Sequence, residues 1–92
     1  MTMTLDQLNY LLVLAEEQNV TRAAQRLYIT QPTLTTFITK LERELGTKLF
    51  DRARNPVRTT KNGELYIQKM RELLLAEQQL KKELKYHKIL QE

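Results

Sequence analysis

The most constraining feature of this sequence is the stretch from Asn19 to Gly46, where two short amphipathic segments are separated by a break of a few residues. Small or apolar residues recur through this stretch at offsets typical of two crossing helices: Ala24, Leu27, Ile29, Leu34 and Ile38. The small side chain of Ala24 allows a close helix crossing, and the break between Leu27 and Thr30 has room only for a tight turn. The stretch is therefore predicted to form a helix-turn-helix unit.

The second helix of this unit carries its own start and stop signals. Thr30 can accept the backbone N–H of Thr33 with its hydroxyl, and Pro32 has a φ fixed near the helical value. Gly46 is a typical residue for a helix C-terminus. We therefore expect this helix to begin at about Gln31 and to stop at Gly46.

The same helix has one apolar and one polar side when its residues are placed 100° apart. The apolar stripe, expected to face the core, consists of Leu34, Ile38, Leu41 and Leu45. The opposite side and its flanks hold Gln31, Pro32, Thr33, Thr35, Thr36, Thr39, Lys40 and Arg43. Glutamine can pair with adenine through two hydrogen bonds, and a threonine methyl can contact the thymine methyl. A merely solvated helix would more often carry Glu and Lys, so the pattern favours a helix that reads DNA.

A set of anchors at fixed spacing extends this pattern: Ala23, Ala24, Leu27, Thr30, Gln31, Pro32, Leu34, Thr35, Ile38, Leu41, Glu42, Leu45, Gly46, Leu49, Phe50, Arg52, Thr60 and Gly63. With these anchors the chain resembles the N-terminal DNA-binding domain and linker helix of LysR-type transcriptional regulators. Two residues depart from the family pattern: Phe37 stands where Gln is usual, and Asn62 stands where Ala is common. Phe37 replaces a possible base or phosphate contact, whereas Asn62 concerns local packing.

The resemblance implies a mainly α fold, a winged helix-turn-helix followed by a long linker helix. It also implies a transcription factor that binds double-stranded DNA as a homodimer, with antiparallel pairing of the linker helices and an inverted repeat as target. We expect residues 1–60 to form the DNA-binding domain and residues 61–92 the dimerisation helix. A small-molecule effector is expected to act only through a domain that this sequence does not include.

Length and charge agree with this reading. Ninety-two residues make one domain at most, with a core small enough that support from a partner subunit is expected. The net charge is +4, and residues 48–61 hold five basic residues against a single acidic one. A basic segment favours an anionic partner. The absence of Cys, of a long apolar run and of a secretion signal leads us to expect a cytoplasmic protein with neither disulfides nor a membrane partner.

The first helix is expected to begin at Thr4, because Thr4 and Gln7 form a capping box, and to end near Gln18. Its apolar surface is wide enough to pack on the helix-turn-helix along one side and on the last helix along the other. Asn19 should then cap the next helix and leave Thr21 and Arg22 at its exposed start, where they can donate to a DNA phosphate. For Arg22, an ordinary solvated residue is an equally good interpretation.

A small hairpin, the wing (residues 48–60), is predicted after Gly46. Strands at 48–51 and 57–60 flank a turn at 52–56, with Leu49, Phe50 and Val57 as core anchors. The projecting residues would be Arg54, Asn55 and Arg58. Arginine suits a narrow minor groove, which favours Arg54, whereas the family resemblance aligns Asn55 with the groove, so both remain candidates. Arg52 and Glu42 either form an ion pair between wing and helix or contact DNA.

A final helix is predicted from a cap at Thr60 to about Leu90. Residues at alternating steps of four and three form a seam along it: Tyr66, Met70, Leu73, Glu77, Leu80, Leu84 and His87. We expect Tyr66, Met70, Leu73, Leu80 and Leu84 to mediate dimerisation. Leu65, Leu74 and Leu75 add apolar surface outside the seam, as a helix that also packs on its own domain requires.

Catalytic signatures are missing from the sequence. It has no Ser or Cys, its single histidine is His87, and its carboxylates show no metal-binding spacing. We therefore expect no enzyme activity, no metal and no cofactor. The alternative function is a winged-helix protein-interaction module that dimerises through its long helix and binds no specific DNA. The polar face from Gln31 to Thr36 argues against it, because protein-binding surfaces are richer in exposed aromatic residues.

Overall fold

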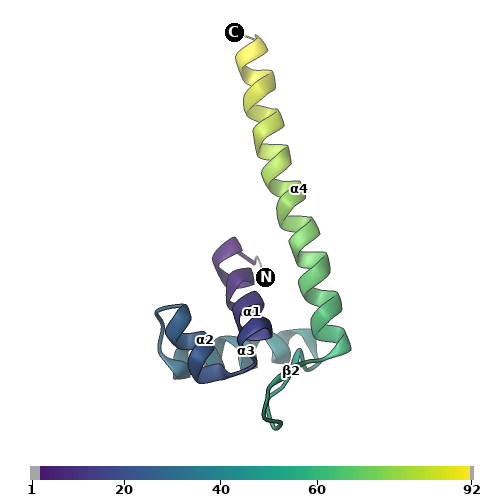
Figure 1. Cartoon of the computed structure of the whole chain (residues 1–92). Coiled ribbons are helices and arrows are strands. Elements are labelled where there is room, and N and C mark those ends of the chain that lie inside the picture. The colour runs from purple at the N-terminus through teal and green to yellow at the C-terminus, as the bar shows by residue number, and fades with distance from the viewer. Residues whose placement is uncertain (1–2, 92) are drawn as a thin grey trace.

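The computed structural model describes the backbone of residues 3–91 and the side chains of residues 3–88. The elements follow in the order α1 (Leu5–Glu17), α2 (Val20–Arg26), α3 (Gln31–Leu45), β1 (Phe50–Asp51), β2 (Arg58–Thr59) and α4 (Lys61–Gln91). The predicted mainly α winged helix-turn-helix with a long final helix is confirmed. In Figure 1 the first three helices and the hairpin form the base, and α4 rises from it far beyond the other elements.

The helix caps predicted from the sequence are all present in the structure. Thr4 and Gln7 form the capping box of α1, with N···O distances of 3.1 and 3.0 Å. Asn19 accepts the backbone N–H of Arg22 at 2.8 Å and so caps α2. Thr30 accepts that of Thr33 at 3.2 Å at the start of α3. Local hydrogen bonds therefore define where these three helices begin.

The core lies where α1 covers the helix-turn-helix and the first half of α4. Leu8, Leu11 and Leu14 of α1 are buried, as is Ala24 at the crossing of α2 with α3. Three of the four residues of the predicted apolar stripe of α3 are also buried: Leu34, Ile38 and Leu41. The fourth, Leu45, is 40% exposed, so its predicted core position is wrong. The last turn of α3 ends beside an open groove, and the core does not extend to it.

Phe37, one of the two departures from the family pattern, is a packing residue. Its ring meets that of Tyr10 edge to face, with centroids 5.4 Å apart and planes at 86°. Edge-to-face pairs of this kind stabilise beyond simple burial. Phe37 thus joins α3 to α1. Asn62, the other departure, donates its side-chain amide to the hydroxyl of Thr47 at 2.8 Å, a local contact as expected.

The wing is attached to α3 by the buried carboxylate of Glu42, which is only 4% exposed. Its Oε2 accepts the backbone N–H groups of Leu49, at 2.7 Å, and Phe50, at 3.2 Å. Its Oε1 accepts from Arg52 Nη2 at 3.1 Å. The ion pair between Glu42 and Arg52 is therefore present. A carboxylate with three donors is satisfied in a place where an unpaired charge would be strongly destabilising.

The strands of the wing are shorter than predicted, two residues each, paired antiparallel with Phe50 opposite Thr59 and Asp51 opposite Arg58. The Leu49 carbonyl still accepts the N–H of Thr60 across the hairpin, but two other flanking N–H groups are bonded elsewhere. The N–H of Leu49 goes to Glu42, and that of Val57 goes to the carbonyl of Gln18 at 2.9 Å. These two N–H groups therefore do not pair with the opposite strand. They attach the hairpin to α3 and to the end of α1.

The start of α4 is joined directly to the wing. The Thr60 hydroxyl accepts the N–H of Gly63 at 2.9 Å and donates to the carbonyl of Lys48 at 2.7 Å, so the predicted cap at Thr60 is confirmed. Ile67 and Leu74 of α4 are buried in the core. The helix continues to Gln91, one residue past the predicted end; the side chain of Leu90 lies outside the described part.

Replacing Glu42 by Ala should lower the free energy of unfolding by about 3–5 kcal/mol, because two buried N–H groups and Arg52 lose their acceptor. Urea unfolding at one fixed protein concentration measures the change. Glu44→Ala, two residues away on the exposed surface of α3, is the matched control and should change stability by less than about 0.5 kcal/mol. Similar losses in both variants would contradict the anchoring role of Glu42.

The two glycines should respond differently to replacement by Ala. A Cβ on Gly63 would lie 2.0 Å from the carbonyl oxygen of Leu49. This oxygen belongs to the backbone, so it cannot move away by a side-chain rotation. We expect Gly63→Ala to destabilise by about 3 kcal/mol, the upper end of the usual range for overpacking, because it displaces α4 from the wing. Gly46→Ala meets no atom within 4 Å but forces Ala to φ +72°, so it should cost only about 1–2 kcal/mol. Thermal unfolding of both variants compares the two losses of stability. A larger loss for Gly46→Ala than for Gly63→Ala would contradict this prediction.

Candidate nucleic-acid interface

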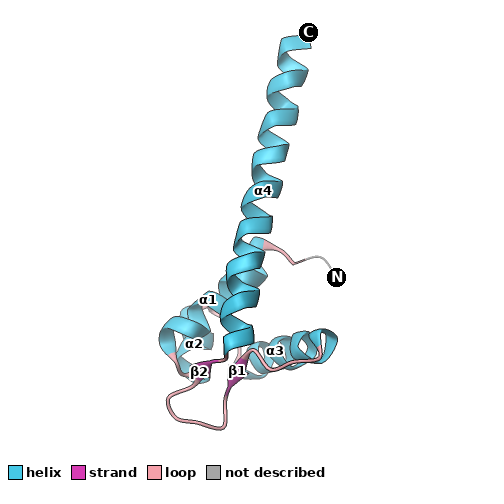
Figure 2. Ribbon diagram, turned by 90° about the vertical axis from the view of Figure 1, so that its right-hand side faces the viewer, coloured by secondary structure: helices cyan, strands magenta, loops and turns pink. Residues whose placement is uncertain are grey.

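The N-terminal half of α3 and the wing border one open groove of about 650 Å³. Its lining comes from the start of α2, from α3 and from the wing: Val20, Gln31, Thr35, Lys48, Phe50, Asp51, Arg52, Ala53 and Thr60. In Figure 2 the wing projects from the base at the end opposite the tip of α4, beside α3. The structure thus brings together two regions that the sequence had singled out separately.

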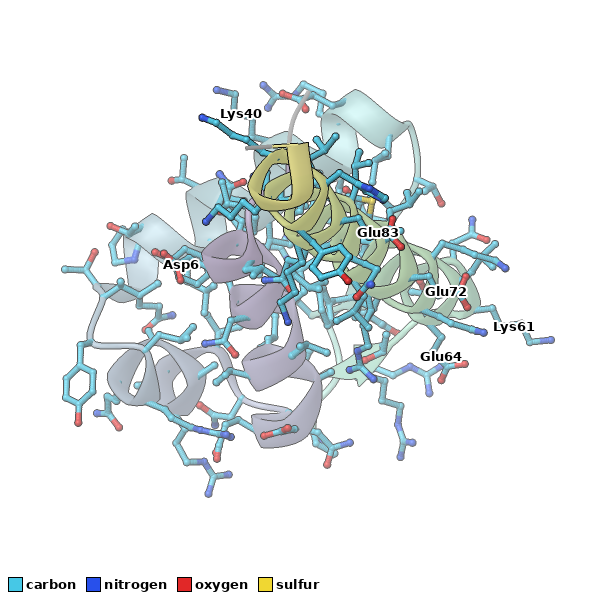
Figure 3. All side chains as sticks on the ribbon, turned by 90° about the horizontal axis from the view of Figure 1, so that it is seen from above. Asp6, Lys40, Lys61, Glu64, Glu72 and Glu83 are labelled. Atoms are coloured by element: carbon cyan, nitrogen blue, oxygen red, sulfur yellow. The ribbon has the colours of Figure 1, made fainter. Side chains whose placement is uncertain are left out.

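The expected base-reading residues fall into distinct environments along α3. Gln31 and Thr35 face the groove toward the wing. Thr36 and Lys40 lie on the other flank, in a shallow depression shared with Arg43, and Lys40 points outward at the edge of the molecule in Figure 3. Pro32 is exposed between the two flanks. All of these residues remain accessible on one side of the helix.

Thr33 has a structural partner. Its hydroxyl lies 2.7 Å from that of Thr30, the cap residue whose side chain also accepts the Thr33 N–H. Thr33 therefore reinforces the start of α3 and has less freedom to meet a base than Thr35 or Thr36.

Thr21 and Gln31 form a hydrogen bond between α2 and α3. The Thr21 hydroxyl donates to Gln31 Oε1 at 3.0 Å. A hydroxyl has one hydrogen, and Thr21 directs it to Gln31 here, so the predicted contact of Thr21 with a DNA phosphate stays a prediction. The neighbouring Arg22 has an exposed side chain at the start of α2, where contact with a phosphate and simple solvation both remain open.

Arg54, Asn55 and Arg58 of the wing are all exposed. Arg54 Nε lies 2.9 Å from Asp51 Oδ2, and this contact restrains the arginine near the base of the turn. Arg52 differs, since its side chain is only 22% exposed and its guanidinium donates to both Glu42 and the Thr39 hydroxyl, the latter at 3.2 Å. Arg52 is thus a structural link between wing and α3.

Thr39 and Asp51, which have roles here, were missing from the predicted site, and Lys48 was expected only as a phosphate contact. Thr39 accepts from Arg52, Asp51 restrains Arg54, and Lys48 lines the groove beside Gln31. The position of Thr39 on the polar side of its helix and the place of Lys48 in the basic segment were readable from the sequence. The pairing of Asp51 with Arg54 required knowledge of the turn between them.

The seam residues of α4 divide into two groups. Tyr66 and Met70 pack partly against the core, and burial, together with the negative charge of Glu44, raises the pKa of Tyr66. The others are exposed: Leu73 to 61%, Leu80 to 53% and Leu84 to 61%. Outside the seam, Leu74 is buried, whereas Leu65 and Leu75 are exposed. Charged residues such as Lys61, Glu64 and Glu72 point away from α4 in Figure 3.

Residues 3–88 contain no group of three or more His, Asp or Glu side chains placed to hold a metal ion. Among the described helices, none is long and apolar enough to cross a membrane.

Comparison with known proteins agrees with this geometry. Residues 5–64 match the family model of the bacterial regulatory helix-turn-helix protein, lysR family. The HTH-type transcriptional regulator BenM of Acinetobacter baylyi is 44% identical over 72% of this chain and 22% of its own length. TfdT of Cupriavidus pinatubonensis is 42% identical over 78% of this chain and 32% of its own length. The chain thus spans less than a third of these curated relatives.

Solved structures are similar over most of the chain. The BenM DNA-binding domain in complex with catB site 1 DNA superposes with a TM-score of 0.72 at 41% identity, covering 85% of this chain and 84% of that one. The CbnR DNA-binding domain in complex with DNA gives a TM-score of 0.77 at 28% identity, covering 92% and 98%. The chain therefore belongs to the LysR family of bacterial regulatory helix-turn-helix proteins.

Proposed function

We propose that this chain is the DNA-binding part of a bacterial transcriptional regulator and binds duplex DNA sequence-specifically. The observation that carries the proposal is the shared groove, because the polar side of α3 and the basic wing open toward the same side of the molecule. An α-helix fits the major groove, and an arginine-bearing wing beside it can reach the minor groove. The BenM and CbnR domains, with the same fold, are titled as DNA complexes.

In this proposal the site residues have different tasks. Gln31, Pro32, Thr35 and Thr36 meet base edges, and Thr33 supports them through the cap. The cationic side chains contact DNA phosphates or enter the minor groove, and Asn55 forms a hydrogen bond beside them. These cations are Arg22, Lys40, Lys48, Arg54 and Arg58. Residues 1–60 form the DNA-binding domain, and residues 61–92 provide the dimerisation helix.

The whole regulator is proposed to act as a cytoplasmic homodimer without catalytic activity of its own. The exposed seam leucines support pairing of α4 helices, and the relatives are named as transcriptional regulators. A two-fold dimer presents two copies of α3, so its target is an inverted repeat with half-sites on one face of the duplex. An effector, in this view, binds a further domain of the full-length regulator. A pure protein-interaction module is not favoured, because five of the seven exposed leucines among residues 3–88 lie on α4 and none lines the groove.

Binding to duplex DNA should weaken steeply with salt, because several cations displace counterions from the phosphates. Arg54→Gln and Arg58→Gln should each reduce the slope of log affinity against log salt by about one. Lys82→Gln, an exposed lysine on α4 away from the groove, is the matched control and should leave the slope unchanged. Fluorescence anisotropy at stepped salt concentrations measures the slopes. A flat plot for the unmodified chain would reject DNA binding in favour of the interaction module.

Leu80→Glu should convert the dimer to a monomer in sedimentation analysis and greatly weaken binding to a two-half-site DNA, because it places two charges in an apolar interface. Leu84→Glu should add to the effect. Leu75 is similarly exposed but lies about 180° from the seam on a helical wheel, so Leu75→Glu is the control and should stay dimeric. A dimeric Leu80→Glu variant would show that the interface lies elsewhere.

A further inference from the structure

We infer that Thr21 is a positioning residue that fixes the side-chain amide of Gln31 and thereby chooses the base edge that Gln31 recognises. The inference rests on the proposed function. Its starting point is the hydrogen bond from the Thr21 hydroxyl to Gln31 Oε1, 3.0 Å long, which links the first turns of α2 and α3 on their exposed side.

The backbones on either side of this bond are held in place. Thr21 follows the Asn19 cap of α2, which binds the N–H of Arg22, and Gln31 follows the Thr30 cap of α3. The two helices pack against each other, and Ala24 of α2 and Leu34 of α3 are both buried. With both first turns fixed, the bond needs only two side-chain rotamers to form. Thr21 and Gln31 are therefore arranged before any DNA arrives.

The bond determines which groups of the amide are offered to DNA. A glutamine side chain carries one acceptor oxygen and one NH₂ group with two donors. The familiar pairing with adenine uses both, since Oε1 accepts from N6 and Nε2 donates to N7. Thr21 takes one of the two lone pairs of Oε1 and holds this oxygen toward α2, so Gln31 presents its Nε2 donors. In the major groove, guanine N7 and O6 are both acceptors, so this arrangement favours guanine over adenine at a purine contacted by Gln31.

The expected size of the preference follows from the strength of one hydrogen bond. A typical neutral hydrogen bond shifts an equilibrium by a factor of about 2–12. Removing the Thr21 hydroxyl should therefore shift the guanine-to-adenine ratio at the Gln31 position by about that factor toward adenine. The other positions of the DNA site should keep their preferences, because within residues 3–88 the Thr21 hydroxyl bonds to Gln31 and to no other proposed base-contacting side chain.

The test compares Thr21→Val, which keeps the shape but removes the hydroxyl, with Thr21→Ser, which keeps the hydroxyl. Selection from a randomised DNA library gives the base preference at every position, and anisotropy gives the affinity for random duplex DNA. We expect Thr21→Val to shift one position toward adenine, Thr21→Ser to retain the original preference, and both to bind random DNA as the unmodified chain does. In the Gln31→Ala background, Thr21→Val should have no further effect at that position.

Two results would overturn the inference while leaving the proposed function intact. An equal loss on all sequences, random DNA included, would make Thr21 a phosphate contact. A shift that persists in the Gln31→Ala background would make Thr21 a direct reader of a base.

A measurement without DNA separates the two proposals. The side-chain NH₂ resonances of Gln31 should move in Thr21→Val and not in Thr21→Ser. Unchanged resonances in Thr21→Val would show that the hydrogen bond between Thr21 and Gln31 is not formed. The inference would then be wrong, whether or not the chain binds DNA. If the resonances move but the unmodified chain binds no duplex DNA at low salt, the proposed function fails and the base-reading role fails with it.

Discussion

The buried carboxylate of Glu42 is the contact on which the arrangement of this domain depends. It accepts two N–H groups from the wing and one from Arg52, so the start of the hairpin is held against α3 by three hydrogen bonds. Arg52 in turn reaches Thr39 on the polar side of α3. Because the wing has only two paired residues per strand, its own pairing provides little rigidity. The relative position of wing and α3, and hence the width of the groove, depends on this side chain together with the bond from Val57 to Gln18 at the end of α1.

The same network continues from the wing into α4. Leu49 donates its N–H to Glu42 and gives its carbonyl to the N–H of Thr60, whose hydroxyl holds the first turn of α4. Gly63 allows α4 to start within contact of the Leu49 backbone, where a Cβ would not fit. The direction of the long helix and the position of the groove are thus coupled through Leu49. In a dimer paired through α4, this coupling would transmit the helix angle to the spacing of the two α3 helices.

Sequence reasoning succeeded where the determining interaction is local. The caps at Thr4, Asn19, Thr30 and Thr60 each depend on residues within three positions, and all were predicted. Leu45 was placed wrongly because helical periodicity continues to the end of α3, whereas the core that would cover it does not. The bond between Thr21 and Gln31 joins residues ten apart through a helix crossing, and no periodicity reports its geometry. The element types were therefore predictable, but the hydrogen-bonding state of the site was not.

The two halves of α4 have different roles, which explains why so small a domain carries so long a helix. Ile67 and Leu74 complete the core of the base, so the first half of α4 is needed for folding. Beyond them, Leu80 and Leu84 have no cover within the described chain, and burial of a leucine contributes about 1.5–3 kcal/mol. Covering them in a dimer would also stabilise the helix that leads back to the core. Dimerisation, the stability of the base and the spacing of two grooves would then be linked through one continuous helix.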